Sequence, residues 1–134
     1  MIFYHLTPRR NVGSILRKGL LPSPSTSMGS WEEGPAEEDT RGKIFLGTSG
    51  EECIYNLWNT RVNNPDDVKG IKGWALLEVS LPSNWPLTKD EYGFIYTEEP
   101  VPPRYTRFFR NITMRDMWNM EEEGRFQKWR EEVF

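Results

Sequence analysis

The stretch Ile2-Phe3-Tyr4-His5-Leu6-Thr7-Pro8 leads directly into residues 12–18, where apolar side chains recur at helical spacing. Its first six residues have the composition of a β-strand. Thr7 is a suitable N-cap and Pro8 a suitable first helical residue, while Gly19 predicts a left-handed C-cap. A strand joined without a loop to a short helix predicts the opening of an α+β domain.

The strand carries the only histidine of the chain, His5. A neutral imidazole offers one hydrogen-bond donor and one acceptor, so it can contact a ligand. A histidine in this position can equally complete the packing of a core edge. Both interpretations stay open at the level of this residue alone.

Length and composition predict a single domain over residues 1–134 with an aromatic-rich core, because the chain has six Trp, seven Phe and five Tyr. With 17 basic and 20 acidic residues, the molecule has no general attraction to phosphate backbones or anionic lipid. Local basic patches remain candidates for nucleic-acid contact, one at Arg9-Arg10 with Arg17-Lys18 and one at Arg104, Arg107 and Arg110.

Cys53 is the sole cysteine, so we expect no disulfide, no zinc site and no other metal. It lies in a helical pattern without a nearby histidine, which favours a buried structural thiol over a nucleophile. The chain shows neither a secretory signal pattern nor an apolar run of membrane-spanning length. We therefore expect a cytoplasmic protein that does not enter membranes.

Two segments differ in composition from the rest. Residues 22–42 are rich in Pro, Ser, Gly and acid, which predicts a mobile acidic loop. Residues 113–134 carry Met and aromatic stripes that predict a helical C-terminal segment. We expect strands at 2–7, 43–49, 73–81 (central in its sheet), 91–96 and 105–109, and helices at 8–18 and 51–61.

The order of His5, Phe45 and Glu91 on three predicted strands resembles the ADP-ribosyltransferase superfamily. The resemblance is to its His-Tyr-Glu branch, which includes poly(ADP-ribose) polymerases and DNA-modifying toxins. Tyr4-His5-Leu6-Thr7-Pro8 looks like the toxin-type start, and Glu91-Tyr92-Gly93-Phe94-Ile95-Tyr96 like the polymerase segment that begins with the catalytic glutamate. Residues 96–105, with Val101-Pro102-Pro103, are similar to the closing segment found also in tRNA 2′-phosphotransferases. Together the matches cover residues 2–109.

The resemblance implies a fold of split, mainly antiparallel sheets flanked by short helices, and a transferase that uses NAD as co-substrate. Cleavage of the nicotinamide–ribose bond builds positive charge on the sugar, and Glu91 would stabilise it as a carboxylate. His5, Thr7 and Phe45 would form the cofactor cradle. Trp85, in the loop before Glu91, would contact the acceptor, which is a protein or a nucleic acid.

Phe45 departs from the family pattern, which has tyrosine, so the stacking face is kept and the hydroxyl is lost. This favours an alternative: a noncatalytic regulator or inhibitor that binds a protein partner through the acidic loop or the C-terminal aromatic helices. A third interpretation is an RNA 2′-phosphotransferase-like enzyme using Arg9, Arg10 and Arg17. It ranks lower because the chain begins at the first strand and because its loop is acidic. The sequence also leaves Asp90, Glu98 and Glu99 as competitors of Glu91 for the cleft.

Overall fold

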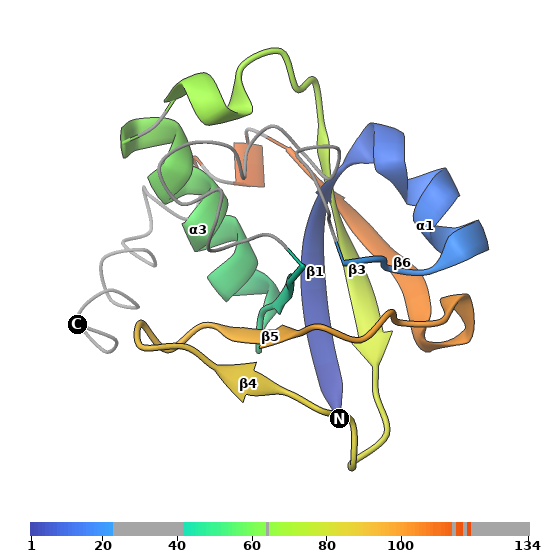
Figure 1. Ribbon diagram of the computed structural model, residues 1–134. Helices are drawn as coiled ribbons and strands as arrows, with labels where there is room; N and C mark the ends of the chain where they lie inside the picture. The colour runs from blue at the N-terminus through green and yellow to red at the C-terminus, as the bar shows by residue number, and fades with distance from the viewer. Residues whose placement is uncertain (23–41, 64, 114, 117, 119–134) are drawn as a thin grey trace.

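The computed structural model describes residues 1–22, 42–63, 65–113, 115, 116 and 118. Two three-stranded antiparallel sheets organise these residues, one in the order β1-β3-β6 and one in the order β2-β5-β4 (Figure 1). The mixture of helices with antiparallel sheets confirms the predicted α+β class. The strands are β1 (Ile2–Pro8), β2 (Ile44–Leu46), β3 (Trp74–Ser80), β4 (Thr88–Lys89), β5 (Ile95–Thr97) and β6 (Thr106–Ile112), the helices are α1 (Val12–Lys18) and α3 (Gly50–Asn63), and the 3-10 turns are η1 (Arg9–Asn11), η4 (Pro65–Val68) and η5 (Pro103–Tyr105).

We call β1-β3-β6 the larger sheet, because each of its strands has seven residues. The strand β3 lies at its centre, as the sequence predicted. It pairs with β1 on one side and with β6 on the other, with a register irregularity between Leu76 and Leu77. Four of its side chains are completely buried. A nearly continuous apolar run of this kind is required where both faces of a strand are covered.

The two faces of the larger sheet are covered by different elements (Figure 1). The helix α3 packs on one face, and α1 together with β2 and β5 covers the other. Side chains alternate between the two faces along a strand, so β1 and β3 contribute to both cores. The core under α3 contains Leu6, Cys53, Ile54, Leu57, Trp74, Leu76 and Ile112, and the opposite core contains Phe3, Ile15, Leu20, Ile44, Leu46, Leu77, Val79 and Val101.

A pair of backbone hydrogen bonds joins the two sheets along the side of β1 that faces away from β3. The Tyr4 amide donates to the Gly47 carbonyl over 2.8 Å, and the Gly47 amide donates to the Tyr4 carbonyl over 2.7 Å. Gly47 directly follows β2. This junction brings the middle of β1 beside the end of β2, and therefore brings His5 next to Phe45.

The predicted start of the first helix is wrong. Thr7 and Pro8 are not its cap and first residue, because both belong to β1, where they pair with Ala75 and Trp74. The Arg9 amide then donates to the Gly73 carbonyl over 2.9 Å, which extends the strand ladder past Pro8. Pairing with β3 therefore overrides the local helix-start signal, and α1 begins only at Val12, after η1.

The predicted end of that helix is confirmed. Gly19 has a φ of 84°, and its amide donates to the Ile15 carbonyl over 2.7 Å. The chain then pairs with the segment after β5, because Leu20 and Val101 exchange backbone hydrogen bonds of 2.9 Å in each direction. A Cβ on Gly19 would lie 2.1 Å from the Val101 carbonyl oxygen, so this approach excludes any side chain.

The predicted strand over residues 91–96 starts too early. β5 begins at Ile95, and residues 90–94 form the turn of a β4–β5 hairpin. The Asp90 carboxylate accepts hydrogen bonds of 2.9 Å from the amides of Tyr92 and Phe94, and Gly93 has a φ of 89°. An Asx-type turn with a left-handed glycine thus replaces extended backbone at Glu91.

Two predicted segments lie largely outside the described residues. The acidic loop over residues 22–42 is described only at its two ends, and the C-terminal segment over residues 113–134 only at four positions. No helix within the described residues combines the length and the apolar character needed to cross a bilayer.

Candidate functional site around His5

His5 is buried in the middle of β1, with 3% of its surface exposed. Its Nδ1 lies 2.9 Å from the carbonyl oxygen of Phe45, on the neighbouring sheet. Burial lowers the pKa of His5 below its ordinary value, against the smaller opposing effect of the hydrogen bond to the Phe45 carbonyl. The ring is therefore neutral at pH 7.

The Phe45 carbonyl also determines which ring nitrogen carries the proton. A carbonyl oxygen only accepts hydrogen bonds, so Nδ1 must be the protonated nitrogen of the neutral ring. Nε2 is then a bare acceptor, and it has no hydrogen-bond partner among the described residues. His5 thus presents an acceptor of fixed orientation to any group that reaches it.

A small cavity adjoins His5, which we call the His5 cavity. It lies where β1, the end of β2, the first turns of α3 and the β4–β5 hairpin meet. Its volume is about 50 Å³, enough for little more than a water molecule. Ten residues line it: Tyr4, His5, Leu6, Phe45, Leu46, Gly47, Glu52, Cys53, Asn56 and Phe94.

Phe45 lies beside His5, as the resemblance implied, and belongs to an aromatic group. Its ring is edge-on to Phe94 at a centroid distance of 6.5 Å and tilted against Tyr96 at 5.7 Å. The Lys43 ammonium lies 4.7 Å from the Tyr96 ring centroid. The half-buried Phe45 side chain therefore forms part of the hairpin contact as well as part of the cavity wall.

Thr7 lies two residues beyond His5 on the same face of β1. It is almost completely buried, and its Oγ1 has no hydrogen-bond partner among the described residues. A buried hydroxyl left unsatisfied costs about 1–3 kcal/mol. Thr7 does not line the His5 cavity.

Trp85, the predicted acceptor contact, is held in place by the described part of the fold. Its indole Nε1 donates to Thr97 Oγ1 over 3.0 Å, and its ring is edge-on to Tyr105 at 5.8 Å. It also packs against the core that contains Leu77 and Val79. These contacts explain Trp85 as a packing residue, and an acceptor role stays a prediction.

Glu91, the predicted catalytic residue, lies exposed at the tip of the β4–β5 hairpin and does not line the His5 cavity. The hairpin instead contributes Phe94 to the cavity wall. Among the competing acids, Asp90 holds the turn through its carboxylate, while Glu98 and Glu99 are exposed beyond β5. The structure therefore brings His5 and Phe45 together and leaves Glu91 apart from them.

The carboxylate that does line the cavity is Glu52, a residue not singled out from the sequence. Its Oε2 accepts hydrogen bonds from the Thr48 amide over 2.9 Å and from Thr48 Oγ1 over 2.6 Å. The Glu52 amide donates to Ser49 Oγ over 3.1 Å, so these residues form a variant of the capping box at the start of α3. Asn56, one turn further along α3, also lines the cavity.

Cys53 is buried beneath this cavity, as predicted. Burial, with a smaller effect from the neighbouring Glu52 charge, raises the pKa of its thiol to about 12. Its Sγ lies 3.8 Å from the Tyr4 carbonyl oxygen, which accepts its weak hydrogen bond. The thiol is therefore protonated at neutral pH and poorly suited to be a nucleophile.

The described residues contain no group of three or more His, Cys, Asp or Glu side chains able to hold a metal ion. Comparison of the chain with family models finds no match, and comparison with curated proteins and with solved structures finds no significant one. The similarity to ADP-ribosyltransferases therefore stays a prediction from the motifs.

Proposed function

We propose that the protein is an NAD-dependent ADP-ribosyltransferase whose cofactor cleft runs along the junction of the two sheets, in the split-sheet arrangement of that superfamily. The observation that carries the proposal is the neutral His5, held by the Phe45 carbonyl with Nε2 as a free acceptor among the described residues. A packing role would require only one hydrogen bond. The second nitrogen, on a residue that lines a cavity, supports a role in binding.

The residues present fit the polar groups of NAD. His5 Nε2 would accept a hydrogen bond from a ribose hydroxyl, and Thr7 Oγ1 would gain the partner that it lacks among the described residues. Phe45 would offer its ring for stacking against a planar heterocycle. These three roles need no charged residue, which agrees with the neutral imidazole.

The size of the His5 cavity sets a condition on this proposal. Its volume of about 50 Å³ is far below that of sites for ligands of this size, which run to about 300–1,000 Å³. NAD binding therefore requires outward displacement of the hairpin that carries Phe94. The hairpin suits this movement, because β4 has only two residues, both exposed, and among the described strands it pairs only with β5.

Two residues are candidates for the carboxylate that would assist the reaction. When bound, NAD supplies the glycosidic bond to nicotinamide, whose cleavage leaves positive charge on the ribose. Glu91 is the candidate from the motif, and the same hairpin movement would change its distance from the cavity. Glu52 is the candidate from the cavity lining, although the N-terminus of α3 already uses one of its oxygens.

Transfer of labelled ADP-ribose from NAD in a cell extract tests this function and identifies the acceptor together. We expect Glu91→Gln to reduce the rate by about 100-fold or more, the size typical for loss of one electrostatic stabiliser. Glu52→Gln, which keeps an acceptor for the helix cap, should change the rate only a few-fold. The reverse pattern would assign the role to Glu52. No transfer in the wild type, with no NAD binding, would favour the noncatalytic regulator.

A further inference from the structure

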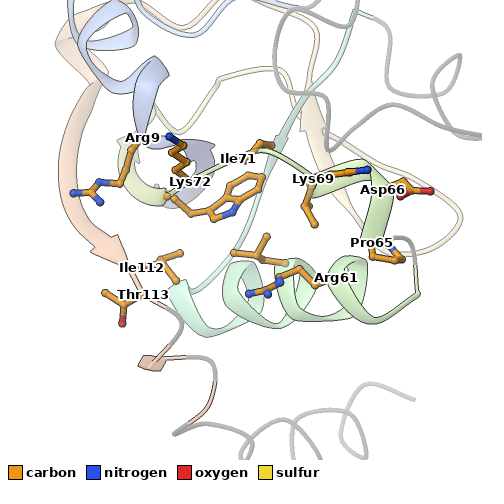
Figure 2. A pocket seen from close by; sticks show the side chains of 13 residues that line it. Arg9, Arg61, Pro65, Asp66, Lys69, Ile71, Lys72, Ile112 and Thr113 are labelled. Atoms are coloured by element: carbon orange, nitrogen blue, oxygen red, sulfur yellow. The ribbon is translucent and has the colours of Figure 1, made fainter.

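A second and larger cavity lies near the C-terminal end of α3, and we call it the basic cavity. Its volume is about 680 Å³, within the range of small-molecule sites. It is enclosed by the last turns of α3, by η4 with the loop that leads to β3, and by the end of β6 (Figure 2). It shares no lining residue with the His5 cavity.

Charge is the distinctive property of the basic cavity. Four basic residues and one acidic residue, Asp66, contribute to its lining, although the chain as a whole has a net charge of −3. In Figure 2 Arg61 projects from α3 on one side, and Lys69 and Lys72 extend from the loop on the other side. Such a local excess attracts anions even to an acidic protein.

Most of these cations are not engaged in ion pairs within the described part of the chain. Arg107 and Arg110, on β6, have carboxylate partners in Glu78 and Asp116. Arg9, Lys69 and Lys72 form no ion pair with any described residue. The fold therefore gathers these three cations at one cavity, where Asp66 is the only described carboxylate in the lining and forms an ion pair with none of them.

Arg9 is positioned by the backbone beside it. Its amide donates to the Gly73 carbonyl over 2.9 Å, and a Cβ on Gly73 would lie 2.5 Å from Arg9 Cδ. The arginine stem therefore lies flat against a residue that has no side chain. A side chain at residue 73 would disturb this contact without removing a charge from the cavity lining.

The floor of the basic cavity is apolar. Leu57, Trp74 and Ile112 line it and are buried, and Ile71 is half-buried beside them. A neighbouring cavity of about 400 Å³ shares Arg9, Ile71, Lys72 and Gly73 with it and adds Arg10 to the wall. A ligand with both a flat apolar part and more than one negative charge would match this combination of basic wall and apolar floor.

We propose that the basic cavity binds the phosphate groups of a nucleotide, with the apolar floor beneath the base or sugar. Arginine and lysine are the usual partners of phosphate oxygens, and the volume accommodates one nucleotide unit. The source is a free nucleotide or a unit of a single strand. The inference does not depend on transfer of ADP-ribose, because no residue of the His5 cavity takes part.

Binding of two labelled probes to the full chain, measured by fluorescence anisotropy without NAD, tests this proposal. One probe is a fluorescent ATP analogue, and the other is a labelled oligothymidine of about 12 nucleotides. We expect Lys72→Glu to weaken binding about tenfold or more, and Gly73→Ala to weaken it less. The matched control Lys89→Glu makes the same charge change on exposed β4 and should leave binding within about twofold.

Salt dependence identifies phosphate contact directly. Between about 50 and 200 mM salt, removal of one phosphate contact should reduce the slope of log affinity against log salt by about one. Tighter binding of the oligothymidine would assign the site to a strand, and tighter binding of the ATP analogue to a free nucleotide. Equal effects of Lys72→Glu and Lys89→Glu would overturn the proposal, as would no binding of either probe at about 1 mM. A separate NAD titration of His5→Asn reports on the other cavity alone.

Discussion

The buried neutral His5 should make the protein lose stability between pH 6.5 and pH 5.5. Burial lowers the pKa of His5 in the folded state, so the unfolded chain binds the proton more readily. Stability is therefore complete above the ordinary pKa of about 6.5 and falls as the pH drops below it. If the folded ring stays neutral across this interval, linkage gives a loss of about 1 kcal/mol.

The chain is well suited to this measurement. His5 is the only histidine, so no other side chain with an ordinary pKa near 6.5 contributes to the slope. Urea unfolding followed by tryptophan fluorescence at a series of pH values gives the free energy of unfolding. His5→Asn is the matched variant, because its amide can donate to the Phe45 carbonyl and does not titrate. The same pH slope in His5→Asn, or no slope in the wild type, would refute the reasoning.

Three further predictions concern the fold. Gly19→Ala should lower the free energy of unfolding by more than about 2 kcal/mol, because the new Cβ would meet the Val101 carbonyl. Gly70→Ala, at a similar φ but with open space around the new Cβ, should lower it by only about 1 kcal/mol. Thermal unfolding compares the two variants, and equal costs would contradict the close approach of Val101. Cys53 should react with a thiol reagent at pH 8 only at the rate of unfolding, and fast reaction in native buffer would show that it is accessible. Leu77→Ala should cost about 2–5 kcal/mol in urea unfolding, and a cost under about 1 kcal/mol would argue against a central β3.

The elements with strong periodic patterns could be predicted from the sequence. The apolar run at residues 73–81 is β3, and the pattern over residues 51–61 is the centre of α3. Gly19 ends its helix as the sequence indicated. These features depend on local residue types or on a continuous apolar face, and tertiary contacts reinforce both.

The predictions of secondary structure were wrong where strand pairing, or a side chain that binds backbone amides, overrides the conformation that the local residue types favour. Thr7 and Pro8 have the types of a helix start, yet pairing with β3 keeps them extended. Glu91 follows a residue, Asp90, whose carboxylate binds two backbone amides and turns the chain. Neither competition is visible until the partner strand or the turn is in place.

The candidate site was predictable only in part. The family resemblance implied that His5 and Phe45 lie together, and Nδ1 of His5 does lie at the Phe45 carbonyl. Glu52 reaches the same cavity only because α3 starts beside the sheet junction. The stretch Ser49-Gly50-Glu51-Glu52 has the spacing of a capping box, which would have revealed the helix cap and not the cavity. The basic cavity combines residues from separate segments, and only the loop between η4 and β3 supplies two cations close in sequence.

The central claim is that His5 Nε2 receives NAD at the sheet junction, and thermal unfolding with and without NAD tests it most directly. A ligand at ten times its dissociation constant adds about 1.4 kcal/mol, which raises the melting temperature by a few degrees. At about 1 mM NAD we predict this rise in the wild type and its loss in His5→Asn, which keeps a donor for Phe45 but lacks the Nε2 acceptor. No rise in the wild type, or an equal rise in His5→Asn, would contradict the account.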